Sequence, residues 1–140
     1  MFRKPWVLLL VTVVLLAACG GQAAPAGSGS DVAAGQKLFQ QATLGKDKVP
    51  GCVTCHSVEP DKKLVGPSLA GIAADAASTV KEPDYKGQAK TAQDWLRESI
   101  TNPNVDVPEG FQPNVMPQNL KDELSSQEIN SLIAYLMTLK

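Results

Sequence analysis

Aromatic and histidine side chains are scarce in this chain of 140 residues, with 5% aromatics and a single histidine. A domain of this size buries only about two-thirds of the surface that its unfolded chain exposes. A core with so few aromatic rings would be thin. We therefore expect something other than side chains to help fill the interior.

The apolar run at the N-terminus is too short to span a bilayer, which takes roughly 20 residues. This run, Trp6–Ala18, has 13 residues, follows Arg3 and Lys4, and ends just before Cys19. A basic segment followed by a short apolar one is typical of an export signal. Residues 1–18 are therefore predicted to be a signal peptide.

The sequence Leu-Ala-Ala-Cys at 16–19 also resembles the lipobox of bacterial lipoproteins. The resemblance implies that Cys19 is acylated, becomes the mature N-terminus and anchors the exported protein to a membrane. An ordinary secretory peptide with Cys19 as a bystander is the alternative. Residues 19–30 are predicted to be the lipidated cysteine and a flexible linker after it, because residues 20–30 are rich in Gly, Ala and Ser.

The chain also has no excess of basic residues over acidic ones. The chain has 13 Lys and Arg against 14 Asp and Glu, and loss of Arg3 and Lys4 with the signal would leave 11 against 14, a net charge of about −3. Nucleic acids attract basic surfaces. We therefore expect no nucleic-acid partner.

Strands of alternating polarity are not evident from Asp31 onward, and the pattern over residues 31–140 predicts one all-α domain. Three helices are expected. The first begins near a capping Ser30, and a loop through Gly45 and Pro50 follows it. The second begins at Thr91 and stops before Pro103, and the third begins at a Ser125–Glu128 capping box. Their predicted core residues are Gly35, Leu38 and Phe39; Trp95, Leu96 and Ile100; and Ile129, Leu132, Ile133 and Leu136.

Three soft ligands stand together in Pro50–Ser57, which reads PGCVTCHS. Paired cysteines at this spacing serve zinc binding, thiol–disulfide exchange or haem attachment. A structural zinc site needs four ligands, and the domain offers only Cys52, Cys55 and His56. A redox disulfide is typical of a βαβ unit, which the pattern lacks, and an inert disulfide is a further alternative. Cys-x-x-Cys-His is the signature of covalent haem attachment, which we favour.

Geometry explains that signature. If Cys52 and Cys55 lie on about one helical turn, both sulfurs can bond to one edge of the porphyrin, and His56 is carried to the iron as an axial ligand. Methionine is the remaining candidate for a sixth ligand. Met1 leaves with the signal, and Met137 lies in the last helix, where packing is the expected role. Met116 lies in a loop with four prolines, which restrict the conformations from which a weak ligand must be held.

Over nearly all of residues 31–140 the sequence resembles the class I c-type cytochromes. The residues that carry this resemblance are Gly35 and Phe39 in the first helix, CVTCH, GPSLAGI at 66–72 and VMPQNL at 115–120. It implies that the first helix crosses the last at Leu132 and Tyr135, with haem in the core. It also implies one haem c on Cys52 and Cys55, axial ligation by His56 and Met116, and a hydrogen bond from the imidazole to the Pro67 carbonyl.

Two regions depart from the family pattern. The loop at 45–49 is an insertion, and residues 73–90 carry no family signature. Tyr85 and Trp95 are the candidates for bonding the haem propionates, with plain packing as the alternative for each.

The expected function is single-electron transfer rather than catalysis, because two filled axial positions leave no open site on the iron. The segments from Trp95 to Leu120 resemble cytochrome domains of respiratory oxidases and quinol-oxidising complexes, which implies redox-protein partners in a respiratory or photosynthetic chain. A haem subunit fixed in such a complex is the alternative. A peroxidase-like or gas-sensing protein would need a free sixth position, and a thiol oxidoreductase would carry no haem.

Overall fold

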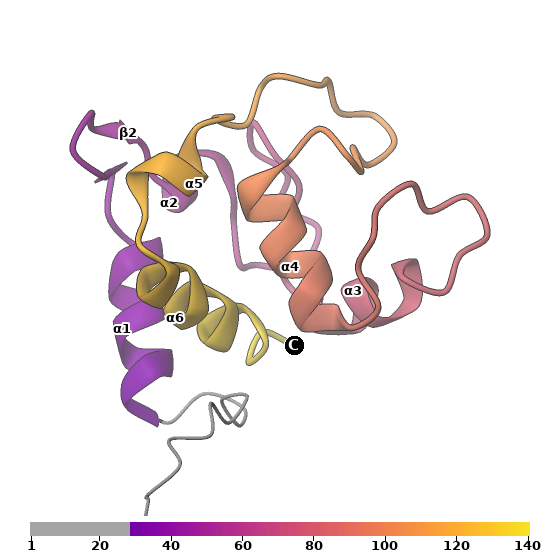
Figure 1. Ribbon diagram of the computed structural model, residues 1–140, viewed down its shortest axis with the longest axis horizontal. Coiled ribbons are helices and arrows are strands. Elements are labelled where there is room, and N and C mark those ends of the chain that lie inside the picture. Colours follow the sequence, from indigo (N-terminus) through magenta and orange to yellow (C-terminus); the bar gives the residue numbers. More distant parts are fainter. Residues whose placement is uncertain (1–28) are drawn as a thin grey trace, which may run out of the picture.

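A computed structural model describes residues 29–140 of the protein, and within this range the fold is mainly helical (Figure 1). The all-α prediction is confirmed. None of the helices in the described range is long and apolar enough to cross a membrane. The elements in chain order are α1 (Gly29–Phe39), β1 (Thr43–Leu44), β2 (Val49–Pro50), α2 (Cys52–Cys55), α3 (Ile72–Thr79), α4 (Ala92–Thr101), α5 (Leu120–Glu123) and α6 (Ser126–Leu136).

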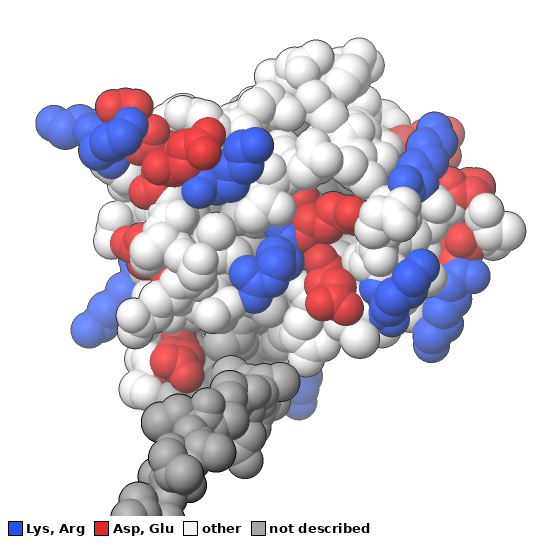
Figure 2. Space-filling view, viewed as in Figure 1, with Lys and Arg blue, Asp and Glu red and all other residues white. Residues whose placement is uncertain are grey.

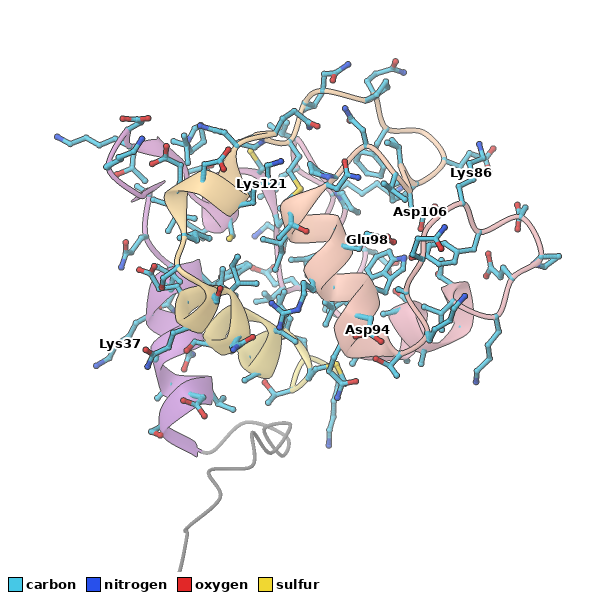
Figure 3. The ribbon with its side chains drawn as sticks, in the orientation of Figure 1. Lys37, Lys86, Asp94, Glu98, Asp106 and Lys121 are labelled. Atoms are coloured by element: carbon cyan, nitrogen blue, oxygen red, sulfur yellow. The ribbon has the colours of Figure 1, made fainter. Side chains whose placement is uncertain are left out.

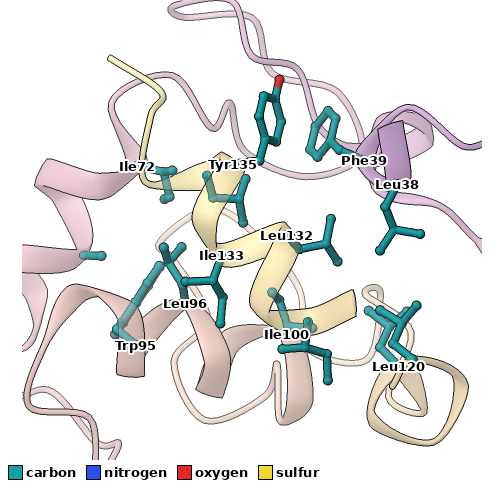
Figure 4. Packing of buried hydrophobic residues seen from close by; sticks show 14 of the residues in the cluster. Leu38, Phe39, Ile72, Trp95, Leu96, Ile100, Leu120, Leu132, Ile133 and Tyr135 are labelled. Atoms are coloured by element: carbon teal, nitrogen blue, oxygen red, sulfur yellow. The ribbon is translucent and has the colours of Figure 1, made fainter. Parts of the chain in front are cut away.

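The first and last helices cross where α1 has no side chain. A Cβ added at Gly35 would overlap the carbonyl of Ser131 and lie 2.9 Å from the Cβ of Tyr135. Glycine is therefore required for this close approach. One turn further along α1, the rings of Phe39 and Tyr135 pack with centroids 5.5 Å apart and planes tilted by 55° (Figure 4). The crossing expected from the resemblance is confirmed.

The predicted caps of α4 and α6 are present. The Thr91 hydroxyl accepts a hydrogen bond from the backbone N–H of Asp94 and begins α4, which ends two residues before Pro103. At the start of α6, the Ser125 hydroxyl accepts from Glu128 N, while the Glu128 carboxylate accepts from Ser125 N at 2.8 Å. Each cap satisfies backbone donors that a helix start leaves without partners.

The core lies between α6, α1 and α4, and its composition is mostly aliphatic (Figure 4). All of the core residues predicted for the three helices are buried. Leu44 and Leu132 are each only 1% exposed. Leu120 of α5 and Ile72 of α3 complete the cluster, so the two short helices are tied to the same core.

Three features differ from the sequence prediction. Helix α1 begins at Gly29, one residue before the expected cap Ser30, and the last two residues of the predicted linker are helical. The expected loop at 43–50 is a small antiparallel hairpin in which Leu44 pairs with Val49. The region after residue 72 contains α3, which follows the left-handed Gly71 (φ 74°) and has no side-chain hydrogen bond at its N-cap.

Candidate haem site

The two paired cysteines occupy a single helical turn. Helix α2 runs from Cys52 to Cys55, and it closes with a 2.8 Å hydrogen bond from His56 N to Cys52 O. Gly51 precedes the turn and donates its N–H to Ala42 O at 2.9 Å. A Cβ on Gly51 would overlap the carbonyl of Gln41, so this position also needs glycine. Close contact with the end of the β-hairpin segment therefore fixes where the turn begins.

His56 leaves the turn in an extended conformation (φ −119°, ψ 137°), and its side chain is held from the next segment. The ring nitrogen Nδ1 lies 2.9 Å from the carbonyl oxygen of Pro67. Gly66 lies against the ring, where a Cβ would come within 2.6 Å of His56 Cε1 and 2.9 Å of Nδ1. No role was predicted for Gly66. A glycine directly before Pro67 could have indicated that the backbone approaches another group closely at this point.

The partner of Nδ1 defines the protonation of His56. A carbonyl oxygen can only accept, so Nδ1 carries the hydrogen and Nε2 keeps its lone pair. Burial lowers the pKa of His56 from its usual value, and the hydrogen bond to Pro67 opposes this by raising it. The net lowering favours the neutral ring. A neutral imidazole with a fixed tautomer and a free Nε2 is the form that binds a metal.

The surroundings of Cys52 do not favour a thiolate. Burial raises the pKa of the Cys52 thiol to about 11, whereas redox and metal-binding cysteines have lowered values. Cys52 and Cys55 are not joined to each other by a disulfide bond. Across residues 29–140, no three His, Cys, Asp or Glu side chains converge as a metal cluster would require. Cys52, Cys55 and His56 therefore fit attachment along a porphyrin edge with a separate axial ligand better than they fit zinc.

Exposed apolar side chains near the motif also fit a porphyrin. Among the described residues, the large apolar side chains that remain exposed are Val53, Val58, Leu64, Val65 and Val115. Four of them lie within the Cys52–Pro67 segment, and the fifth, Val115, directly precedes Met116. Exposed apolar side chains mark a binding site where they form one contiguous patch. A flat apolar group bound here would cover such surface.

Met116 is half-buried and packs against the same apolar core as Cys52. Two hydrogen bonds between Asn104 and Asn114 close the part of the loop that precedes Met116. Asn104 Nδ2 donates to Asn114 Oδ1 at 2.7 Å, and Asn104 Oδ1 accepts from Asn114 N at 2.9 Å. Asn114 itself is left-handed (φ 65°), a conformation that asparagine tolerates. These two hydrogen bonds clamp the proline-rich loop two residues before Met116. The clamp was not predicted from the sequence.

Tyr85 and Trp95 each have an acceptor within the chain. The Tyr85 hydroxyl donates to the Glu98 carboxylate, and Trp95 Nε1 donates to Asp106 Oδ2 at 3.0 Å. Both carboxylates lie on the side of α4 that faces the loop before it (Figure 3). These hydrogen bonds anchor the loops on either side of α4 to the helix, and bonding of a haem propionate by Tyr85 or Trp95 stays a prediction.

The fold and the site together are those of a class of protein: small helical domains with a Cys-x-x-Cys-His motif for covalent attachment of haem. The comparison with known families agrees. Residues 32–140 match the Cytochrome c family, and the chain belongs to that family. As a member it carries one covalently attached haem c and serves as an electron carrier.

Several curated relatives are similar over most of the chain. A cytochrome c2 from Rhodopseudomonas palustris is 27% identical over 148 aligned positions, which cover 94% of this chain and 97% of the relative. A cytochrome c2 from Blastochloris viridis is 29% identical over 81% of this chain and 80% of its own length. Cytochrome c2 iso-2 from Magnetospirillum molischianum is 31% identical and covers 64% of the chain. The predicted signal peptide, Cys19 and most of the predicted linker lie outside the described residues.

Proposed function

We propose that the protein is an exported single-electron carrier, anchored to a membrane through a lipid on Cys19. Haem c would bond to Cys52 and Cys55, with His56 and Met116 as axial ligands. The bound haem supplies a reversible one-electron change between ferrous and ferric iron. The chain's residues orient the haem, hold both axial ligands and keep other molecules from the metal.

The hydrogen bond between His56 and Pro67 carries the proposal. It fixes a neutral imidazole with its Nε2 lone pair free, directly beside the turn that holds both cysteines. The contact between Gly66 and the ring restricts rotation of the imidazole. A ligand that is oriented before metal binding needs little rearrangement when the iron changes oxidation state.

The position of Met116 supports the second ligand. The thioether is a weak ligand, so it must be held in place by the chain, and the clamp between Asn104 and Asn114 restricts the loop that leads to it. With His56 and Met116 both bound, the iron has no open position for a substrate. Such ligation favours ferrous iron and raises the reduction potential. We therefore propose a carrier and not an enzyme.

The partners we propose are a redox-protein donor and acceptor of a respiratory or photosynthetic chain on the outer side of the cytoplasmic membrane. A fixed subunit of a quinol-oxidising or terminal oxidase complex is the alternative arrangement. Co-purification from detergent-solubilised membranes distinguishes the two. A carrier elutes as a single small protein, whereas a fixed subunit stays with its complex through a salt wash.

Replacement of Met116 tests the carrier against a peroxidase-like haem protein. Met116→Ala should lower the reduction potential and let carbon monoxide bind the ferrous iron, because the sixth position is then free. Met116→His should restore six-coordination while keeping the potential low, since imidazole stabilises ferric iron better than a thioether does. The potential is measured by redox titration, and carbon monoxide binding by the shift of the Soret band.

Met137→Ala is the matched control. Met137 ends α6 and is half-buried against the core, so its loss removes a sulfur atom but costs only packing, about 1–3 kcal/mol. Its potential and its resistance to carbon monoxide should equal those of the unaltered protein. A Met116→Ala protein that keeps the original potential and still excludes carbon monoxide would show that Met116 is not the ligand.

A further inference from the structure

The β-hairpin before the cysteines is clasped to helix α5 by one carboxylate. Glu123 of α5 accepts a hydrogen bond from the backbone N–H of Asp47 at 3.0 Å. It also forms an ion pair with Lys46 Nζ at 3.2 Å. The Glu123 side chain is only 1% exposed, although Lys46 and Asp47 are themselves on the surface. Side chains of both signs gather over this corner of the molecule (Figure 2). We call this set of contacts the Glu123 clasp.

The backbone of the hairpin turn is shaped to the carboxylate. Gly45 is left-handed (φ 68°), and a Cβ at this position would lie 2.6 Å from Glu123 Cβ and 2.9 Å from Glu123 O. The turn therefore approaches α5 more closely than any other residue would allow. The hydrogen bond from Asp47 N to a buried carboxylate is the main energetic component, because an exposed lysine pair contributes little.

The clasp joins the two segments that hold the proposed axial ligands. The hairpin is continuous with the cysteine turn, since Gly51 bonds to Ala42 O and α2 follows at once. On the other side, α5 begins four residues after Met116, and Glu123 N bonds back to Asn119 O at 3.2 Å. Glu123 therefore connects the segment that follows Met116 to the segment that carries Cys52.

We propose that Glu123 is a positioning residue for Met116, and that the hairpin insertion serves to receive it. The inference rests on the proposed ligation by Met116. Because the cysteines fix the haem to α2, the Met116 segment can move off the iron only by moving relative to α2. The clasp restrains that movement at the α5 end, as the clamp between Asn104 and Asn114 restrains the loop at its other end.

The test compares Glu123→Ala and Asp122→Ala in the haem-loaded protein. Asp122 is the neighbouring exposed residue of α5, so its replacement removes the same charge from the same helix, and within the described range Asp122 has no hydrogen bond or ion pair with the hairpin. We expect Glu123→Ala to bind carbon monoxide at least about tenfold faster than Asp122→Ala, which corresponds to roughly the free energy of one charge-assisted hydrogen bond. Amide exchange of Asp47 N should accelerate in the same variant.

A loss of overall stability must be separated from a loss of positioning. Phe39→Leu serves here, because it weakens the packing between α1 and α6 and leaves the clasp intact. Carbon monoxide should bind this variant no faster than it binds the unaltered protein, measured well below the unfolding temperature. Equal carbon monoxide rates for Glu123→Ala and Asp122→Ala would overturn the clasp proposal, provided that Met116→Ala opens the site. If Met116→Ala does not open it, the ligation by Met116 fails, and the clasp proposal fails with it.

Discussion

The Nδ1 atom of His56 lies 2.9 Å from the carbonyl oxygen of Pro67, and the glycine before that proline lies flat against the imidazole ring. The two hydrogen-bonded residues are 11 positions apart in the sequence. The chain returns over this interval through hydrogen bonds from Gly66 N to Cys55 O and from Leu69 N to Ser57 O. The orientation of the imidazole is therefore built into the backbone of the segment that follows the cysteines.

Gly66→Ala should disturb the orientation of His56. The added methyl group would lie 2.6 Å from Cε1, too close for the ring to stay in place. We expect a larger high-spin fraction in the ferric spectrum and lower thermal stability. Gly29→Ala is the control, since a methyl group added there meets nothing within 4 Å and should leave the spectrum unchanged. An unaltered spectrum in Gly66→Ala would contradict the restriction of the ring.

Gly35→Ala should destabilise the fold even though alanine is the better helix former by about 1 kcal/mol. The Cβ would overlap the Ser131 carbonyl, and overpacking of this kind typically costs about 1–3 kcal/mol or more. We expect a net loss of about 2 kcal/mol in the free energy of unfolding, measured by urea denaturation. Gly29→Ala, where the added methyl meets nothing within 4 Å, should be close to neutral. A stabilised Gly35→Ala protein would argue against the tight crossing.

Tyr85 should ionise unusually late. Burial, and then the hydrogen bond to Glu98, raise the pKa of Tyr85 from 10.0 to about 12. The unfolded chain would release this proton near pH 10, so the phenol's contribution to stability is lost as the pH rises from about 10 to 12. Ultraviolet titration in a Tyr135→Phe background follows Tyr85 alone. Glu98→Gln should move the pKa back only in part, because burial is the larger cause. A phenol that titrates near 10 would contradict the pairing.

Cys19→Ser should release the haem domain from membranes into the soluble extracytoplasmic fraction. The variant lacks the proposed site of acylation, while the domain that begins at α1 is unchanged, so its visible spectrum should be that of the unaltered protein. Fractionation followed by haem staining measures the distribution. A Cys19→Ser protein that stays with membranes after a high-salt wash would argue against the lipid anchor.

Local patterns in the sequence were sufficient for the three long helices. The caps at Thr91 and Ser125 depend on residues three positions away, and the buried faces of α4 and α6 follow the 3.6-residue period. Such signals act within one element and can be read from neighbouring residues. The crossing of α1 with α6 was predicted from the family resemblance, which rests in part on Gly35 and Phe39 of α1.

The β-hairpin and α3 were not predictable for physical reasons. Glu123 stabilises the turn at Gly45 and Asp47, and it lies 76 residues from Asp47 in sequence. No pattern among neighbouring residues predicts a contact between residues this far apart. Helix α3 buries only Ile72 and Ala76 and begins without a side-chain cap, so its amphipathic signal is weak. The clamp between Asn104 and Asn114 joins two exposed side chains and likewise left no periodic pattern.

The crossing of α1 with α6 has a consequence for how the protein is made. Gly35 must meet Ser131, so the domain cannot close until nearly its whole length is available, and contacts this distant in sequence form slowly. The cysteine turn lies between the two helices in the chain and emerges long before α6. If the chain is exported as proposed, the attachment sequence is presented on an open chain, and a cofactor can be joined to it before the last helix packs over α1.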